Sequence, residues 1–400
     1  MNKHMTSVRL LLRRKITARF FTTVLFVCGA VAQVQAQGED ARQAVLDAAT
    51  AMGGVERIQS LRTLRLRGYG HEAYQDGGSE ITTEVAAPEK MTNLAAYERV
   101  IDVPNARTRV KARAFRAFVF AARAMMQGQP LHQVLDGAVA YDVSANGTPR
   151  RAAEVAARQR RMELLAQPVM ALRAALDPAS TLAALRMQDG LRLVDIRTAD
   201  AAQFTLALDP QSKLPSWVQW VGPHENLGEL RYRTEYSAWQ PVTGLLLPMS
   251  FNTVSDFRNT VMLRLHVDRY ELDIAIDDLA ASAEVRAAAA PVPNYTVEAQ
   301  PVARGVWLLA GNNGANSVLL EFADHLTLFE LPTNRAWGEA VIATARRCSN
   351  TNWATIATPS PGQESASSTC RSTPQPWRSA RSSRASRASR SALRLAAPWP

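Results

Sequence analysis

The chain has 400 residues, of which 47% are hydrophobic, and a formal net charge of +10. The positive charge lies at the two ends, since residues 1–36 and residues 348–400 carry +6 each and residues 37–347 carry −2. The high pI is therefore no evidence for a nucleic-acid-binding surface, and we predict no nucleic-acid partner. Because Cys28, Cys348 and Cys370 all lie in the ends, the body holds neither a disulfide framework nor a cysteine-based zinc site.

Residues 1–36 have the pattern of a secretory signal peptide. Six basic residues and no acid accompany an apolar stretch over residues 20–32, and Val34-Gln-Ala36 is a small-x-small cleavage pattern. The apolar stretch is short for a membrane span. We predict export to the periplasm or the medium, with membrane contact only during export. An uncleaved N-terminal anchor is the alternative.

The body, residues 37–280, is predicted to be rich in antiparallel strands. A helix over residues 39–52 should end at Gly53-Gly54, because glycine tolerates the positive φ of a helix end. Alternating patterns then predict a meander whose turn, at residues 76–78, is Asp-Gly-Gly. The predicted strands begin at Leu61 and continue over residues 81–85, 91–103, 107–111 and 131–143.

Two segments interrupt the alternation with helical spacing. Residues 112–126 place Phe115, Phe118 and Met126 on one helical face. Residues 152–176 form the second predicted helix, which Pro168 should kink or divide.

Strands return after Gly190, and their aromatic residues suit a half-buried pleated sheet. The aromatic residues are Trp217, Trp220, Tyr232, Tyr236 and Trp239. The predicted strands cover residues 191–197, 203–209, 215–221, 228–238, 245–254 and 261–276. The predicted class is α+β, with a large curved antiparallel sheet and helical insertions.

Three motifs in this region carry a resemblance. Asp209-Pro-Gln-Ser-Lys-Leu-Pro, then Tyr236-Ser-Ala-Trp, then Gly244-Leu-Leu-Leu-Pro resemble the periplasmic lipoprotein-carrier (LolA-like) family. The resemblance implies an incomplete β-barrel wrapped over helices. It also implies a lipid or another apolar small molecule as ligand.

Residues 281–294 are rich in Ala and Pro and are predicted to be a linker. Three short apolar strands, near residues 306–309, 317–322 and 326–331, and a helix over 334–347 are predicted to follow. The pattern from Gly305-Val-Trp-Leu-Leu onward resembles the first part of a metallo-β-lactamase-fold hydrolase, which places an αββα start at residues 295–347. In that family an acid at the third strand end orients the metal site, and Glu330 stands at that position.

The zinc-binding motif of that family, His-x-His-x-Asp-His, is absent. Residues 348–400 contain no His, Val or Lys and consist mostly of Ser, Arg, Ala, Pro and Thr, so a disordered tail is predicted. One interpretation is a tail translated out of frame. The six histidines are dispersed along the sequence and form no local cluster. They are His4, His71, His132, His224, His266 and His325.

Two hypotheses follow from the sequence. The first is an exported relative of the zinc hydrolases, truncated before its metal motif and inactive, with no catalytic or metal-ligating residue assigned. No cofactor is expected in this chain, and zinc is implied only by the resemblance. The second is a non-enzymatic periplasmic binding or carrier protein for a lipid or another apolar ligand.

Overall fold

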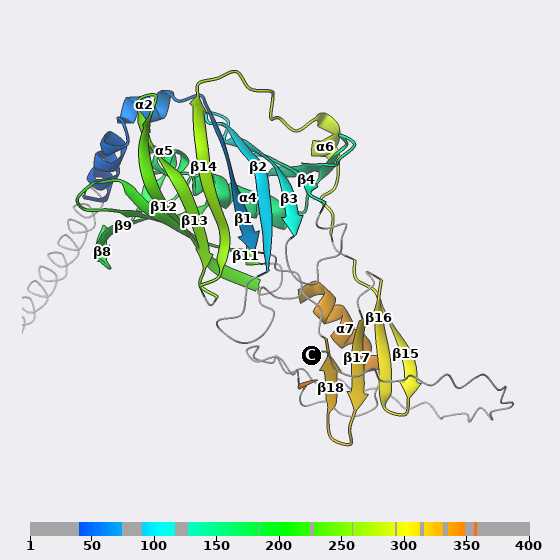
Figure 1. Ribbon diagram of the computed structural model, residues 1–400. Coiled ribbons are helices and arrows are strands. Elements are labelled where there is room, and N and C mark those ends of the chain that lie inside the picture. The colour runs from blue at the N-terminus through cyan, green and yellow to red at the C-terminus, as the bar shows by residue number, and fades with distance from the viewer. Residues whose placement is uncertain are drawn as a thin grey trace, which may run out of the picture. The chain divides into compact units, whose positions relative to one another are not determined.

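The computed structural model describes residues 40–73, 90–116, 127–183, 185–224, 228–257, 259–292, 294–312, 316–330, 335–348 and 356–357. The chain divides into two compact units. One comprises Met1–Tyr295 with Pro332–Gly338, and the other comprises Thr296–Leu331 with Glu339–Pro400. Each unit has its own sheet (Figure 1). The sequence-based domain boundaries stay predictions.

Several predicted features lie outside the described residues. They are the signal peptide with His4, the turn and return strand over residues 76–85, most of the predicted helix over 112–126, and nearly all of the tail. Among the described residues, no helix is both long enough and apolar enough to span a bilayer.

In the described part of the first unit, a 14-stranded antiparallel sheet is formed, and it does not close. The prediction of a large open antiparallel sheet with helical insertions is confirmed. The strands before the central helices are β1 (Thr63–Ala73), β2 (Met91–Asp102), β3 (Arg107–Arg116), β4 (Gln129–Asp136), β5 (Val139–Val143) and β6 (Pro149–Arg151). The strands after them are β7 (Thr181–Leu182), β8 (Arg186–Gln188), β9 (Leu191–Arg197), β10 (Gln203–Leu208), β11 (Pro215–His224), β12 (Gly228–Val242), β13 (Leu245–Ser255) and β14 (Val261–Leu272).

The strand order places the two halves of this series side by side. It runs β6-β5-β4-β3-β2-β1-β14-β13-β12-β11-β10-β9-β7, and β8 also pairs with β9. The first and last strands therefore meet in the middle, and β6 and β7 lie at opposite edges. The chain has to cross from one edge to the other between Arg151 and Thr181.

Two helices make that crossing beneath the curved sheet (Figure 1). They are α4 (Glu154–Leu165) and α5 (Pro168–Leu176). Pro168 divides them as predicted, and it stands at the start of α5, where its missing N–H costs no helical hydrogen bond. Helix α4 contacts β4 and β5 on one side and β11 on the other.

The core lies between the helices and the inner face of the sheet. The helix over residues 40–51 and α2 (Val55–Ser60) add apolar side chains to it. Alternate strand residues such as Leu64 and Leu66 point into the core, as the period-2 pattern predicts. The largest fully buried side chains include Met52, Ile58, Leu61, Leu66, Ile101, Leu135, Leu164, Leu165, Leu172 and Leu206.

Glycine at the end of the first helix has a steric reason. Gly53 has a φ of 127°, and a Cβ placed on it would lie 2.2 Å from the carbonyl oxygen of Gly244. The Leu246 N–H also donates to the Met52 carbonyl oxygen at 2.8 Å. The turn between β12 and β13 thus docks against a helix end that only glycine permits.

Two sequence-based predictions need correction. Residues 112–116 continue β3 instead of starting a helix, because residues 113–116 pair with β2 and residues 112–114 pair with β4. The predicted linker contains a helix, α6 (Ala283–Ala287), whose cap Ser282 accepts from the Val285 N–H. Val285 is buried, so this part of the segment packs on the first unit.

Asp136 holds that segment in place from the end of β4. Its carboxylate accepts from Arg107 Nε at 2.8 Å, from the Ala281 N–H at 2.9 Å, and from Arg286. Asp136 is buried, so these donors replace the water that its charge loses.

The second unit has a smaller, five-stranded sheet in the order β15-β16-β17-β18-β19. Its strands are β15 (Val297–Ala303), β16 (Val306–Gly311), β17 (Asn316–Glu321), β18 (Leu326–Phe329) and β19 (Ile356–Ala357). Helix α7 (Arg335–Cys348) follows β18, and its Thr344 hydroxyl donates to the Val297 carbonyl at 3.3 Å. Strand β19 belongs to the predicted disordered tail yet pairs in parallel with β18, which corrects the prediction at that point.

The two faces of this sheet differ in burial. Leu309, Leu319 and Leu328 are fully buried on one face of the sheet. Val341 and Ala345 of α7 are also buried, with exposed fractions of 1% and 0%. On the other face, Val318 lies opposite Phe329, and these side chains are 36% and 41% exposed.

We expect Asp136→Ala to lower the free energy of unfolding by about 2–3 kcal/mol, because two guanidinium groups and a backbone N–H lose a buried acceptor. Asp278→Ala is the matched control, since Asp278 also pairs with Arg107, at 3.5 Å, but is 79% exposed. The control should cost less than about 1 kcal/mol. Urea unfolding of the full chain measures both changes, and equal losses would contradict the role given to Asp136.

Candidate functional site

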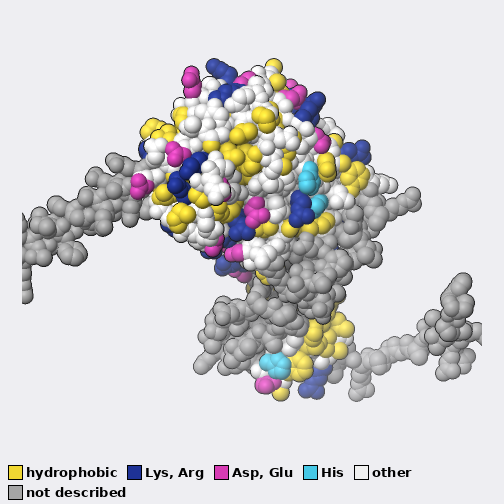
Figure 2. Space-filling view, turned by 60° about the vertical axis from the view of Figure 1, so that its left-hand side comes forward, with side chains coloured by type: hydrophobic (Ala, Val, Ile, Leu, Met, Phe, Trp, Pro, Cys, Tyr) yellow, Lys and Arg dark blue, Asp and Glu magenta, His cyan; other side chains and the backbone are white. Residues whose placement is uncertain are grey.

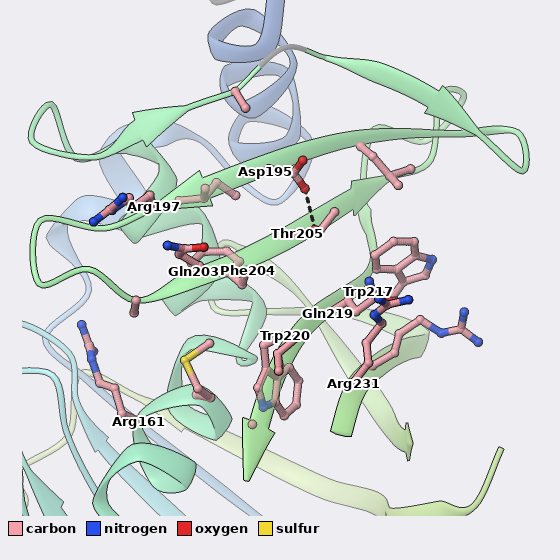
Figure 3. Close-up of a pocket in the computed structure, with 18 of the residues that line it drawn as sticks. Arg161, Asp195, Arg197, Gln203, Phe204, Thr205, Trp217, Gln219, Trp220 and Arg231 are labelled. Carbon is pink, nitrogen blue, oxygen red and sulfur yellow. Dashed lines mark hydrogen bonds between the residues drawn. The ribbon is translucent and has the colours of Figure 1, made fainter. Parts of the chain in front are cut away.

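A fork between two strands opens into a cavity in the first unit. The β10–β11 ladder runs from the Leu208–Pro215 pair to the Thr205–Gln219 pair and stops there. Beyond that point β11 continues to His224, paired with β12 only. Gln203 and Phe204 thus separate from β11. The space between the two strands is part of a groove of about 1220 Å³, which residues of α4, β7, β8, β9 and β12 also line (Figure 3).

Strand register explains which side chains line the upper, solvent side of this groove. Asp195, Thr205, Gln219 and Arg233 form one row across β9, β10, β11 and β12. Because side chains alternate along strands, this row and its neighbours face away from the core. Thr205 Oγ1 donates to Asp195 Oδ1 at 2.6 Å, which fixes both side chains (Figure 3).

Apolar side chains line the depth of the fork. Phe204, Trp220 and Met162 are 4%, 3% and 9% exposed, and Met162 comes from α4 below the strands. Trp217 lies on the outer side and Trp220 on the inner side, because they stand three positions apart on a strand of period 2. The groove therefore joins an apolar interior to a polar rim.

The charges of the rim nearly balance. Six arginines and five carboxylates line the groove. Arg161 pairs with Asp200 at 2.9 Å, Arg233 pairs with Glu235 at 2.8 Å, and Arg186 pairs with Asp195. On the face of the first unit shown in Figure 2, basic and acidic side chains are likewise interspersed. The groove thus has no strong preference for a ligand of one charge.

A polar network lies on the inner face beside the groove. Gln159 Nε2 of α4 donates to Glu163 Oε1 at 3.2 Å. Arg99 donates from Nη1 to the Glu163 carbonyl at 3.2 Å and from Nε to the Tyr97 hydroxyl at 3.1 Å. Burial raises the pKa of Tyr97, while the neighbouring Arg99 opposes that shift.

Glu72, at the end of β1, has an unusual carboxyl group. Burial raises its pKa to about 7, and the charge of Glu163 adds to the rise, while Arg116 opposes it. The group is therefore largely protonated below neutral pH.

The structure does not bring the histidines together as a site. Among the histidines that the structure describes, His71 and His266 lie near each other on β1 and β14, where His71 pairs with Arg264 and Tyr69 pairs with His266. Tyr69 stacks on His266 with ring centroids 5.4 Å apart. Burial lowers the pKa of His71, as do the charges of Arg264 and His266. His325 Nδ1 lies 2.7 Å from Asp324 Oδ1 in an exposed turn. His132 and His224 lie on β4 and β11.

Glu330 follows β18 in the left-handed region, with a φ of 56°. Its carbonyl oxygen accepts from the Ser317 hydroxyl at 2.7 Å, and its side chain is exposed. Among the described residues, no group of three or more His, Cys, Asp and Glu side chains is placed to hold a metal ion. The role of Glu330 beside a metal stays a prediction.

Sequence reasoning missed the groove itself. The sequence predicts Trp217 and Trp220 only as part of an aromatic ladder, although their odd spacing requires them to face opposite sides of the strand. That spacing is the local signal that both faces of β11 carry an aromatic side chain. The end of the β10–β11 ladder has no signature in the sequence.

No family model matches this sequence, and no curated protein matches it. The chain is similar to the solved structure of a LolA superfamily protein from Nitrosomonas europaea, with 12% identity, 59% of this chain and 95% of that chain covered, and a TM-score of 0.35. It is also similar to an outer membrane lipoprotein-sorting protein domain from Vibrio parahaemolyticus, with 6% identity, coverage of 60% and 95%, and a TM-score of 0.35. A DUF1329 family protein from Desulfovibrio piger gives 9% identity, coverage of 60% and 95%, and a TM-score of 0.32.

The prediction of a metallo-β-lactamase-fold, zinc-dependent hydrolase class is wrong. The three solved structures named above are a LolA superfamily protein, a lipoprotein-sorting protein domain and a DUF1329 family protein, and none of the three is named as a metallo-hydrolase. The physical reason is that three short apolar strands and one helix are a local pattern that many folds share.

We expect the stability of the protein to fall as pH rises from about 4.5 to 7 because of Glu72. The folded state holds the proton of this carboxyl up to about pH 7, whereas the unfolded chain releases it near 4.5. Glu72→Gln should remove this fall, which amounts to roughly 3 kcal/mol at most.

Urea unfolding between about pH 3 and 8 measures the effect, with Glu98→Gln as the control of opposite sign. Burial raises the pKa of Glu98, but the hydrogen bond from Arg67 and the charges of Arg65 and Arg109 outweigh it and hold the pKa below its usual value. Its contribution is therefore lost as pH falls. A pH profile that Glu72→Gln leaves unchanged would disprove the assignment.

Proposed function

We propose that this protein is a non-enzymatic, exported binding or carrier protein for an amphiphilic small molecule, a lipid or another ligand with an apolar chain. The observation that carries the proposal is the β10–β11 fork. It combines a volume of about 1220 Å³ with buried apolar side chains at its depth and polar side chains at its rim. Ligand sites are typically concave, mostly apolar and equipped with a few polar groups that orient the ligand.

The geometry suits binding better than chemistry. Most of the charged rim side chains are already ion-paired or hydrogen-bonded to one another, as in the Arg161–Asp200 and Thr205–Asp195 contacts. Phe204, Trp220 and Met162 instead offer apolar surface that an acyl chain would cover. The signal peptide predicted over residues 1–36 places this function in the periplasm or outside the cell.

We expect a bromine-labelled long-chain methyl ester to bind the purified full-length chain and to quench its tryptophan fluorescence saturably, because Trp217 and Trp220 line the groove. Val221→Asp should weaken this binding by about tenfold, since Val221 is 58% exposed at the rim and a carboxylate there opposes an apolar chain.

The matched control is Val155→Asp. Val155 is 44% exposed on α4 and lies outside the groove lining, so the same substitution should leave the affinity unchanged. Quenching that does not saturate, or that Val221→Asp and Val155→Asp alter equally, would refute the groove as the binding site.

A further inference from the structure

Two buried polar atoms without partners flank one glycine in the depth of the groove. Among the described residues, Trp220 Nε1 and Gln159 Oε1 are buried and make no hydrogen bond. A Cβ built on Gly222 would lie 3.3 Å from Trp220 Nε1 and 3.1 Å from Gln159 Oε1. The space that the absent side chain leaves is therefore bordered by one donor and one acceptor.

Both atoms are held in their orientation by neighbours. The Gln159 amide is fixed because its Nε2 donates to Glu163 Oε1 at 3.2 Å, which leaves Oε1 as the free acceptor. The Trp220 indole stacks on Tyr232 with ring centroids 5.7 Å apart, and the Tyr232 hydroxyl donates to the Pro223 carbonyl at 3.2 Å. Trp220 and Gly222 both line the groove, so the place adjoins it, while Gln159 of α4 borders the place from behind the lining.

We propose that the Trp220–Gly222–Gln159 cradle binds a hydroxyl group of the ligand, so that the amphiphile carried in the groove is an alcohol or another hydroxylated lipid. This inference rests on the proposed function. A hydroxyl oxygen accepts from the Trp220 N–H while its proton goes to Gln159 Oε1, so a single group satisfies both atoms.

Fully ionised head groups satisfy only one of the two atoms. A carboxylate or a phosphodiester accepts from the indole but has no proton for the Gln159 oxygen and is repelled by its partial negative charge. An ammonium group donates to Gln159 but leaves the indole N–H unpaired. Because a buried polar atom without a partner is costly, the cradle discriminates against both. The nearly balanced charge of the rim agrees with an uncharged head group.

The test compares 1-decanol with its methyl ether as competitors of the bromine-labelled methyl ester on the full-length chain. The ether accepts from Trp220 but has no proton for Gln159, so the alcohol should bind the native protein about fivefold more tightly. Gly222→Ala should abolish this difference, because its methyl group fills the cradle. Gly222 does not have a positive φ, so alanine introduces no backbone strain there.

Gly338→Ala is the matched control, since a Cβ at Gly338 meets nothing within 4 Å, and it should keep the fivefold preference. Trp220→Phe gives a second variant should Gly222→Ala not fold, and it too should abolish the alcohol's advantage by leaving the hydroxyl without its donor. Equal binding of alcohol and ether by the native protein would overturn the proposal and leave water as the bridge between the two atoms. If no probe binds at all, the proposed function itself fails.

Discussion

The crossing of the chain from one sheet edge to the other is the constraint on which the rest of the first unit depends. Because β6 and β7 end up at opposite edges, residues 152–180 have to run beneath the sheet. They do so as α4 and α5, which cover the apolar inner face that an open sheet would otherwise expose. Burial of this face, and not closure of a barrel, stabilises the sheet.

The same crossing brings polar side chains of α4 under the sheet. Arg160 is buried and donates to the carbonyl oxygens of Val134 and Tyr141 and to the Asp142 carboxylate. Gln159 and Glu163, on the side toward β11, connect to Arg99. Such groups persist in a core only when partners replace their lost water, and nearly all of them have partners. The Gln159 oxygen and the Trp220 indole are exceptions, and both lie beside Gly222, which lines the groove.

The groove exists because strand pairing between β10 and β11 ends early. Sheets twist, and a strand that continues past the end of its neighbour diverges from it. Strand β11 stays paired with β12 up to His224. Strand β10 is paired with β9 along its whole length, starting at the Gln203–Arg197 pair. The two halves of the sheet therefore separate, and α4 closes the gap from below with Met162. In the second unit, by contrast, β16, β17 and β18 stay paired with their neighbours, and one face of the sheet is buried while the other is partly exposed.

Local patterns in the sequence determined the strands from β9 to β14 and the division at Pro168, because alternation, helical period and proline geometry act between near neighbours. They also determined that the body is nearly neutral and lacks cysteine. Tertiary structure decided the pairing of β1 with β14, the extension of β3 through Arg116, the packing of α6 on Asp136, and the place where β10 and β11 part. These features depend on contacts between residues far apart in the chain, whose energies no single segment reveals. The cradle at Gly222 is such a feature, since Gln159 lies on a helix and Trp220 on a strand more than sixty residues later.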